Sequence, residues 1–370
     1  MAEALNLTQL AKDLKDAGAP WEMDESTDMA MMTEDERSRR LGFTPPPGEI
    51  QLAEAERIAA AATAPTAAEI EAEAIGAPAA YDLRNVGGKN FTTSVKNQGG
   101  CGSCVAFGSV AVMETTLKRG RNNPNLAIDL SEAQMFYCHA ASEGRNCGNG
   151  WWPDNAFKKG KANGVTFEAF FPYTAGNQAC NVGSGWQQNL AKVTGHTKLN
   201  SRNDIRNWIS TRGSVTGCFI VYQDFYSYRS GVYRDVSGNS VGGHCVEIIG
   251  YDNAQGCWIC KNSWGANWGE GGYFKIAYGE ANIETWAGPY GVEGVSLRTW
   301  NRNTKVNGLW SNNADRNAWA HLTGVGWRKV ATTNAAVHHA MLAELVAAKG
   351  ASRRVDALET DKKIEQVYVI

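Results

Sequence analysis

The chain has 370 residues, of which 43% are hydrophobic and 20% are charged, and its formal net charge at pH 7 is −2. A chain of this length has room for two or three domains. No stretch approaches the roughly 18 apolar residues of a membrane span, and the near-neutral total charge does not indicate a nucleic-acid-binding protein. We therefore expect neither a membrane nor a nucleic acid as a partner.

The charge is divided unevenly along the chain. Residues 1–80 contain 16 Asp or Glu and 6 Lys or Arg, a balance of −10, whereas residues 81–370 contain 22 acidic and 30 basic residues, a balance of +8. An acidic leader that lies against a basic body would suit an intramolecular inhibitor, and an acidic solvated tail is the alternative.

The leader contains two predicted helices. The first covers residues 6–17, with Asn6 as its N-cap, and the second covers residues 51–62. Residues 59–80 are rich in alanine, contain two prolines and are interpreted as a linker. The first 17 residues have no continuous apolar core, so we see no signal peptide.

The next predicted element is a helix that begins at Cys104. From Cys104 to Leu117 the apolar residues fall mostly on one side of a 3.6-residue repeat, and Gly120 follows a basic last turn. Unpaired N–H groups and the helix dipole favour a thiolate at this end of a helix. The segment by itself fits a catalytic nucleophile and an inert structural cysteine equally well.

Two later segments favour the nucleophile. His244 follows a pair of glycines at the start of an apolar strand, and Asn262 ends the next apolar strand before a loop rich in Trp and Gly. Taken singly, His244 is better interpreted as a buried core histidine and Asn262 as a loop residue. Together with Cys104 they supply a nucleophile, a base and an orienting amide, which is the arrangement that activates acyl transfer.

At these segments the chain resembles the papain family of cysteine peptidases. Gln98 stands six residues before Cys104, a Gly-His pair opens the strand of His244, and Lys-Asn-Ser-Trp-Gly surrounds Asn262, all in the family's order. The resemblance covers about residues 80–297. It implies a two-lobed α+β fold with a helical left lobe and a β-barrel-like right lobe.

The resemblance also assigns roles to site residues. Cys104 would be the nucleophile in an ion pair with His244, and Asn262 would accept a hydrogen bond from the far ring nitrogen of that histidine. The side-chain amide of Gln98 and the backbone N–H of Cys104 would bind the developing oxyanion. Trp264 would lie over the bond between the histidine and the asparagine and keep water out.

The chain departs from the family at several points. Val105 stands where the family usually has Trp or Tyr, which affects packing beside the site rather than the chemistry. The segment at Gly150 resembles the glycine-rich wall that pairs with the substrate backbone, in an altered order. Trp151 would line the specificity pocket and favour an apolar side chain, with a core tryptophan as the alternative. The leader lacks the long helical pattern common in propeptides of plant and animal members.

The chain contains nine cysteines. The resemblance implies disulfides between Cys101 and Cys147 and between Cys138 and Cys180, which favour an extracytoplasmic or secreted destination. Because no signal peptide is visible, the compartment stays open. No set of His and Cys has convincing metal-ligand spacing, so we expect no metal and no cofactor. The other four cysteines are interpreted as buried thiols: Cys218, Cys245, Cys257 and Cys260.

Beyond residue 298 the resemblance ends. A hairpin over residues 319–330, a helix over 334–349 and a second hairpin over 354–370 predict a small ββαββ module. In so small a domain, four tryptophans are interpreted as its core, and a sugar- or peptide-binding surface is the alternative. These are Trp300, Trp310, Trp319 and Trp327.

The sequence thus predicts an acidic regulatory leader and linker over residues 1–80, a papain-like peptidase domain over 81–297 and an accessory module over 298–370. The expected activity is endopeptidase cleavage of peptides or proteins through a Cys-His-Asn acyl-enzyme. We expect the protein to be made as a self-inhibited precursor, with residues 1–80 as the inhibitor. A transacylase or peptide ligase would use the same acyl-enzyme. A catalytically silent binding protein on the papain fold is the second alternative.

Overall fold

The computed structural model describes residues 5–18, 21–73, 76–331 and 333–370. The chain forms two compact units. The first consists of Met1–Val182 and Val193–Val295, and the second of Gly183–Lys192 and Ser296–Ile370. All segments that the sequence analysis assigned to catalysis belong to the first unit.

The leader is built from short elements that begin the first unit. They are α1 (Leu7–Asp16), β1 (Trp21–Met23), α2 (Asp28–Met31), α3 (Glu34–Ser38), α4 (Leu52–Ala61) and α5 (Ala67–Glu73). The predicted cap of α1 is confirmed, because the Asn6 side chain accepts a hydrogen bond from the Gln9 N–H at 3.0 Å. The interpretation of residues 59–80 as a linker was wrong where α5 forms. There Thr66 and Glu69 make the two reciprocal bonds of a capping box.

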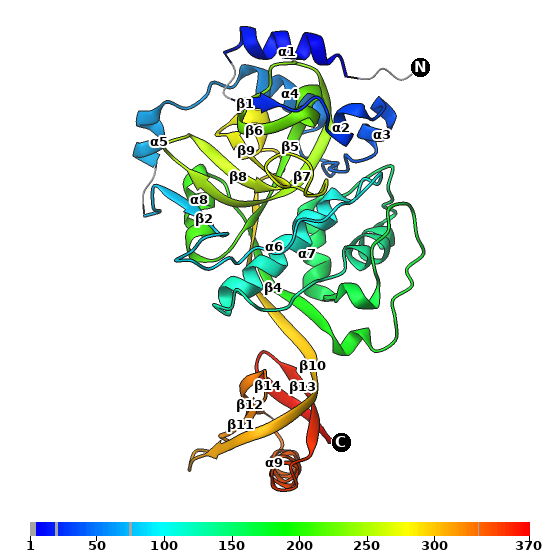
Figure 1. Cartoon of the computed structure of the whole chain (residues 1–370), viewed down its shortest axis with the longest axis vertical. Helices are drawn as coiled ribbons and strands as arrows, with labels where there is room; N and C mark the ends of the chain where they lie inside the picture. Colours follow the sequence, from blue (N-terminus) through cyan, green and yellow to red (C-terminus); the bar gives the residue numbers. More distant parts are fainter. Residues whose placement is uncertain (1–4, 19–20, 74–75, 332) are drawn as a thin grey trace. The chain divides into compact units, whose positions relative to one another are not determined.

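The central helix of the first unit is α6 (Cys104–Gly120), as the sequence predicts. All its residues from Cys104 to Lys118 are buried, so its polar positions also face the protein interior. Figure 1 shows it beside α7 (Pro153–Ala162), and a π-helical turn, η1 (Gln134–Ala140), packs against both. This helical part forms one side of the site.

The other side is a sheet. Its strands follow the order β1-β6-β9-β8-β7-β5. β7, which lies between β8 and β5, and β5 itself are buried almost throughout, as expected of strands that are covered on both faces. The elements of this part are β2 (Ala80–Asp82), β4 (Leu190–Lys198), α8 (Arg202–Thr211), β5 (Val215–Tyr222), β6 (Tyr228–Tyr233), β7 (Ser240–Asp252), β8 (Cys257–Lys261) and β9 (Tyr273–Ala277).

The second unit contains one strand more than the predicted ββαββ module. Its strands β11, β12, β13 and β14 and its helix α9 lie where the sequence predicts them, and the second half of β10 precedes them. The bounds are β10 (Tyr290–Ser311), β11 (Ala318–Leu322), β12 (Gly326–Val330), α9 (Ala335–Gly350), β13 (Arg354–Thr360) and β14 (Lys363–Val369).

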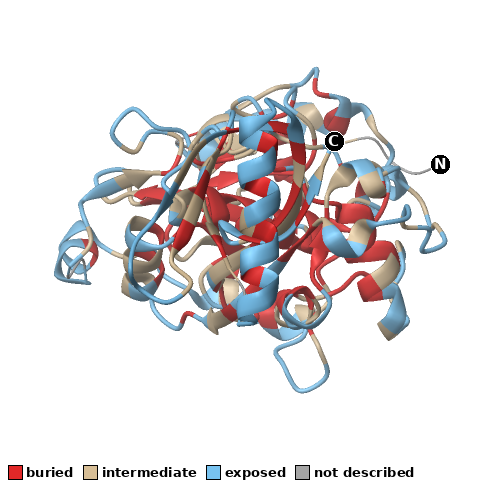
Figure 2. Ribbon diagram, turned by 90° about the horizontal axis from the view of Figure 1, so that it is seen from below, coloured by how far each residue is buried: buried red, intermediate tan, exposed pale blue. Residues whose placement is uncertain are grey.

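The core of the second unit is aliphatic. It is formed by Ala320 and Leu322 of β11, Leu345 of α9 and similar residues of the other strands, and none of the four tryptophans belongs to it. In Figure 2 the helix nearest the viewer is α9, with its outer face exposed to solvent. The interpretation of the tryptophans as core residues was therefore wrong. The indoles of Trp310 and Trp327 are 48% and 47% exposed.

We expect Leu345→Ala to destabilise the second unit by about 2–5 kcal/mol, because Leu345 is fully buried in its core and truncation leaves a cavity. Val346→Ala is the matched control, since its side chain is 53% exposed. Hydrogen exchange of the α9 and β13 amides in the full chain measures the difference. Equal exchange in both variants would contradict this assignment of the core.

Candidate active site

Cys104 is the first residue of α6 and is fully buried. The turn before it is held by the disulfide between Cys101 and Cys147, whose Cα atoms are 4.5 Å apart. The Gly102 N–H donates to the Cys147 carbonyl at 3.0 Å, so the backbone of this turn is tied to the same segment. A disulfide and a buried helix thus fix the position of the Cys104 sulfur.

Burial of the site favours the thiol form of Cys104. Burial is the largest influence and raises the pKa of this thiol, and Cys245 raises the pKa further. Backbone N–H groups of Cys245, Gly42 and Val105 lower the pKa but do not compensate. The thiolate expected at a helix N-terminus therefore requires that water reach the site.

His244 lies on β7 and is fully buried. Its Nε2 is 2.8 Å from Oδ1 of Asn262, an oxygen that also accepts the Ser263 N–H at 2.8 Å. Because this oxygen accepts, Nε2 carries the proton of the neutral ring. Nδ1 hydrogen-bonds to none of the described residues and keeps its lone pair. The Trp264 ring covers the imidazole, with the ring centroids 4.8 Å apart.

Gln98 is fully buried, and its side-chain amide is oriented from both ends. Its Oε1 accepts from the Ser263 hydroxyl at 2.6 Å, and its Nε2 donates to the Cys101 carbonyl at 2.8 Å. The same nitrogen donates to the backbone carbonyl of Arg40 at 2.9 Å. A carbonyl of the leader therefore occupies the donor that the resemblance assigns to the oxyanion.

The leader crosses the site as an extended segment. The Phe43 N–H donates to the Gly243 carbonyl at 3.0 Å, and the Thr44 N–H donates to the Trp151 carbonyl at 3.0 Å. The Trp151 N–H donates to the Gly42 carbonyl at 2.8 Å. Backbone groups on both sides of the site are thus paired with one short stretch of the leader.

Glycines make this close approach possible. A Cβ atom at Gly42 would lie 2.0 Å from the Gly102 carbonyl oxygen, and one at Gly150 would lie 2.1 Å from the Gly42 carbonyl oxygen. Gly150 also has φ +59°, a conformation that favours glycine. Both contacts involve backbone atoms, so no side-chain rotation relieves them.

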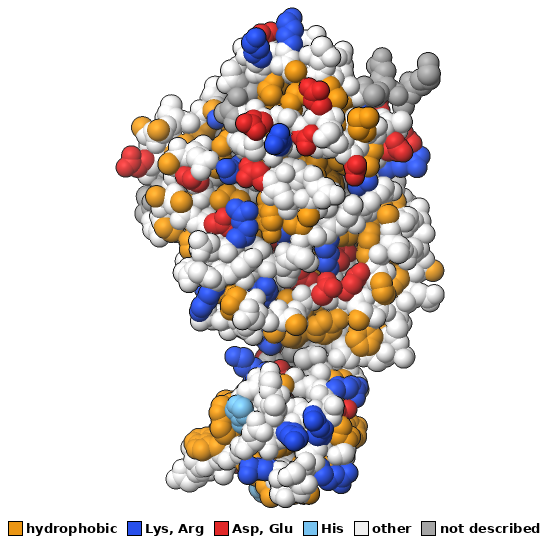
Figure 3. Space-filling view, in the orientation of Figure 1, with side chains coloured by type: hydrophobic (Ala, Val, Ile, Leu, Met, Phe, Trp, Pro, Cys, Tyr) orange, Lys and Arg blue, Asp and Glu red, His pale blue; other side chains and the backbone are white. Residues whose placement is uncertain are grey.

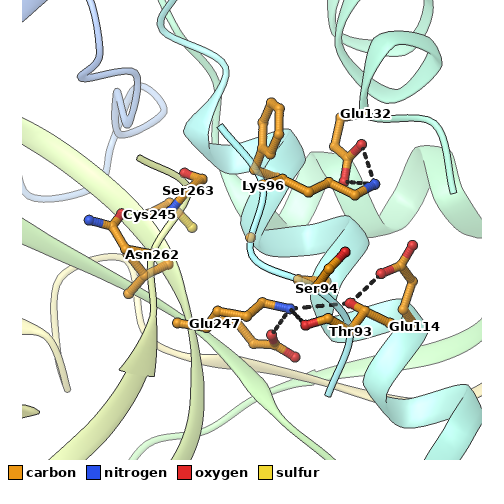
Figure 4. A pocket seen from close by; sticks show the side chains of 14 residues that line it. Thr93, Ser94, Lys96, Glu114, Glu132, Cys245, Glu247, Asn262 and Ser263 are labelled. Atoms are coloured by element: carbon orange, nitrogen blue, oxygen red, sulfur yellow. Dashed lines mark hydrogen bonds and ion pairs between the residues drawn. The ribbon is translucent and has the colours of Figure 1, made fainter. Parts of the chain in front are cut away.

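Behind the site lies a buried cluster of ion pairs. Lys261 Nζ is 2.9 Å from a Glu247 carboxylate oxygen, and Lys96 Nζ is 2.8 Å from Glu132. Figure 4 labels Lys96 with Glu132, and Glu247 with Asn262, which directly follows Lys261 in the chain. Because an unpaired buried charge is costly, the Lys261–Glu247 pair ties β8, which precedes Asn262, to β7, which carries His244.

The structure contains both disulfides that the resemblance implies. The second joins Cys138 to Cys180, with the Cα atoms 4.9 Å apart. The remaining cysteines are free and buried, including Cys257 and Cys260 on β8. Among the described residues no group of three His, Cys, Asp or Glu side chains is arranged to hold a metal ion, and no helix is long and apolar enough to cross a membrane.

Residues 77–288 match the family model described as papain family cysteine protease. The chain belongs to the papain family of cysteine proteases. It is 34% identical over 218 residues to a cathepsin L-like proteinase from Fasciola hepatica, a match that covers 58% of this chain and 64% of the relative. The chain thus spans somewhat less than two thirds of that papain-family relative.

A second relative is ananain from Ananas comosus, 36% identical over 206 residues, which cover 54% of this chain and 56% of ananain. Among solved structures, the digestive procathepsin L2 proteinase from the larval midgut of Tenebrio molitor matches with a TM-score of 0.61 and 26% identity. That match covers 78% of this chain and 88% of the procathepsin chain. The papain-like α+β fold expected from the sequence is confirmed.

The structure brings His244, Asn262 and Trp264 together, and Ser263, between the last two, bonds to Gln98. Cys104 is hydrogen-bonded by the backbone of Cys245, the residue after His244. Val105 is buried beside the nucleophile, within α6. The Trp151 side chain is also fully buried, and its indole N–H donates to Glu143 at 2.9 Å. It is the backbone of Trp151 that meets the extended segment of the leader.

Sequence reasoning missed two contributors to the site. Ser263 orients Gln98, and its only signal was its position between Asn262 and Trp264. Gly42 received no role, although it is a glycine between two large apolar residues in an otherwise polar stretch. Its contacts with Gly102 and Gly150 are long-range and leave no local pattern.

We expect acidification to loosen the covered site. Burial lowers the pKa of His244 to about 4, so the uncovered form binds a proton between about pH 6.5 and 4 and the covered form does not. The free energy that holds the leader in place is therefore complete above about pH 6.5 and falls as the pH decreases toward 4. Hydrogen-exchange protection of the Phe43 and Thr44 amides in a Cys104→Ala background, followed as a function of pH, measures the slope of this free energy against pH. The slope should flatten when His244→Gln is added, and an unchanged slope would contradict the argument.

Proposed function

We propose that residues 81–297 form a cysteine endopeptidase that cleaves peptide bonds through an acyl-enzyme. The observation that carries the proposal is the state of His244. Its Nε2 is bound to Asn262 and its ring is shielded by Trp264, while Nδ1 keeps an unused lone pair. This is the orientation that a general base beside a cysteine nucleophile requires.

In the proposed reaction, Nδ1 of His244 takes the proton of the Cys104 thiol, and the sulfur attacks the amide carbonyl carbon. The Gln98 amide and the Cys104 backbone N–H stabilise the oxyanion. The C–N bond breaks as the imidazolium protonates the leaving amine. His244 then activates water, which releases the carboxylic acid and restores the thiol. Asn262 keeps the ring in the required tautomer throughout.

We propose further that residues 1–80 act as an intramolecular inhibitor and make the chain a precursor. Hydrogen bonds of Arg40 and Gly42 occupy the groups that would otherwise bind substrate. Upstream, Trp21 is only 4% exposed, and its indole N–H donates to the Arg234 carbonyl at 2.9 Å. Backbone pairing and apolar burial anchor the leader. Its acidic charge contributes ion pairs of Glu49 with Lys198 and of Glu73 with Arg202.

The burial of the Phe43 side chain against Trp286 supports a preference for apolar substrate side chains. Its side chain is 4% exposed and meets the edge of Trp286, with ring centroids 4.7 Å apart. We propose that a substrate places an apolar side chain there while its backbone pairs with the wall at Gly150 and Trp151. Peptides and proteins with such a side chain are the proposed substrates.

A chain that begins at Ala80 should cleave a peptide library, and Cys104→Ala should abolish the cleavage because the nucleophile is lost. Gln98→Ala should lower kcat by roughly 10²- to 10³-fold, since one oxyanion donor disappears. Cys257→Ala is the matched control, because this buried thiol lies on β8 and takes no part in the proposed chemistry. Mass spectrometry of the products reports kcat and the bond that is cut.

Two outcomes would contradict the peptidase. If Cys104 of the truncated chain reacted with no epoxide-type thiol inhibitor, the site would be silent. If an added amine captured most of the acyl group in place of water, the protein would be a transacylase. Each result selects one of the alternative functions.

In the full chain, Gly42→Ala should increase labelling of Cys104 and basal peptide hydrolysis by roughly 5- to 150-fold. The added Cβ meets a backbone oxygen at 2.0 Å, and overpacking of this kind costs about 1–3 kcal/mol. Gly120→Ala is the control, because a Cβ there meets no atom within 4 Å. Rates equal to those of the unaltered chain would show that the segment at Gly42 does not limit access.

A further inference from the structure

The second unit is a closed five-stranded barrel. Residues 298–305 of β10 pair with β13 and residues 306–311 pair with β11, and the ring continues through β12 and β14 back to β13. Numbered within the unit, the strand order is 1-2-3-5-4 and back to 1, with the third and fifth strands parallel and the helix between the third and fourth. This connectivity is that of an OB-fold, whose second and third strands form a common ligand-binding face.

The outer face of this barrel carries a row of two aromatic and two basic side chains. Trp310 of β10 is the direct partner of Trp319 of β11, which pairs with Lys329 of β12, which in turn pairs with Lys363 of β14. Direct partners on neighbouring strands project to the same side of a sheet. Because Ala318, Ala320 and Leu322 of β11 face the core, the row faces outward.

A third indole completes the platform. Trp327 is paired with His321, and their rings meet edge to face at 5.3 Å. Its indole lies over Gly308, where a Cβ would come within 3.2 Å of the ring, so the glycine leaves room for it. The three indoles and Asn317 line an open hollow of about 530 Å³. We call the surface formed by Trp310, Trp319, Trp327, Lys329 and Lys363 the aromatic-basic face.

The second unit as a whole is basic, like the aromatic-basic face. Residues 183–192 and 296–370 contain twelve Lys or Arg and six Asp or Glu, a balance of +6 in a chain whose total is −2. On the side of the unit seen in Figure 3, basic side chains outnumber acidic ones. Two of the six acidic groups of the unit are already paired, Asp315 with Arg316 and Glu359 with Arg328.

Barrels of this kind bind oligonucleotides or oligosaccharides, and the polar groups around the hollow distinguish between these two ligand classes. A neutral oligosaccharide needs hydrogen-bonding partners around the stacking surface. The hollow offers one side-chain amide, Asn317, whose Oδ1 accepts the Trp319 indole N–H at 3.0 Å and whose Nδ2 donates to Asn312 at 2.8 Å. Flat indoles beside lysines instead match bases that stack and phosphates that attract cations.

We propose that the aromatic-basic face binds single-stranded nucleic acid, with bases stacked on the indoles and the phosphate backbone along Lys329 and Lys363. This proposal is independent of the peptidase activity. It reverses the expectation that a nucleic acid is not a partner. That expectation rested on the total charge, in which the acidic leader conceals the basic second unit.

The test uses the full chain with Cys104→Ala and a fluorescently labelled oligo(dT) of about 12 nucleotides, followed by anisotropy at about 50 and about 200 mM salt. We expect Trp310→Ala and Trp327→Ala each to weaken binding by roughly 5- to 150-fold. Lys329→Gln should weaken binding and reduce the salt slope by about 1. The controls are Tyr368→Ala, an aromatic side chain that is 57% exposed outside the platform, and Lys349→Gln, an exposed lysine of α9.

Binding that depends on salt and on the indoles, and that is weaker for a duplex of the same sequence, would support the proposal. Four outcomes would overturn it. These are no binding to oligo(dT) or oligo(rU) at low salt, binding that the tryptophan substitutions leave unchanged, equal binding to heparin, which has no bases, and tryptophan-dependent binding of a neutral oligosaccharide alone. Circular dichroism of each variant establishes that the barrel remains folded.

Discussion

Exclusion of water from Cys104 and His244 is the constraint on which the rest of the first unit depends. Both side chains have no exposed surface, and burial raises the pKa of the thiol and lowers that of the imidazole. Each group is therefore held in its neutral form. Opening of the site to water reverses both shifts together, so the ion pair needed for catalysis and the departure of the leader are thermodynamically linked.

That exclusion is achieved mainly by backbone. Gly42 lies against Gly102 and Gly150 at distances that tolerate no Cβ, and its carbonyl pairs with the wall at Trp151. A backbone cover suits the proposed peptide-binding site, because the leader and a peptide would use the same main-chain donors and acceptors. The side chain of Phe43 adds an apolar anchor beside Trp286.

The rigid parts of the first unit predict that the proposed site keeps its geometry when the leader is absent. Cys104 is fixed by a fully buried helix and a disulfide, and Asn262 follows a strand tied down by the Lys261–Glu247 pair. None of these contacts involves residues 1–80. The second unit is stabilised differently. Its core is made of aliphatic residues, and large indoles lie on its surface.

The sequence by itself determined the helix that begins at Cys104, the helix α9 and the short strands around it, because these signals are local periodicities and stops. Through the family resemblance, it also predicted the hydrogen bond of His244 to Asn262 and the cover of Trp264 over the imidazole. Only the tertiary structure decided the positions of Gly42 and of the tryptophans. Pairing of the leader with Trp151 and Gly243 joins residues more than 100 positions apart and leaves no local pattern. In β11, small and large residues alternate, and alternation separates two faces without saying which is inside. Barrel closure placed Ala318, Ala320 and Leu322 inside and therefore left Trp319 facing solvent.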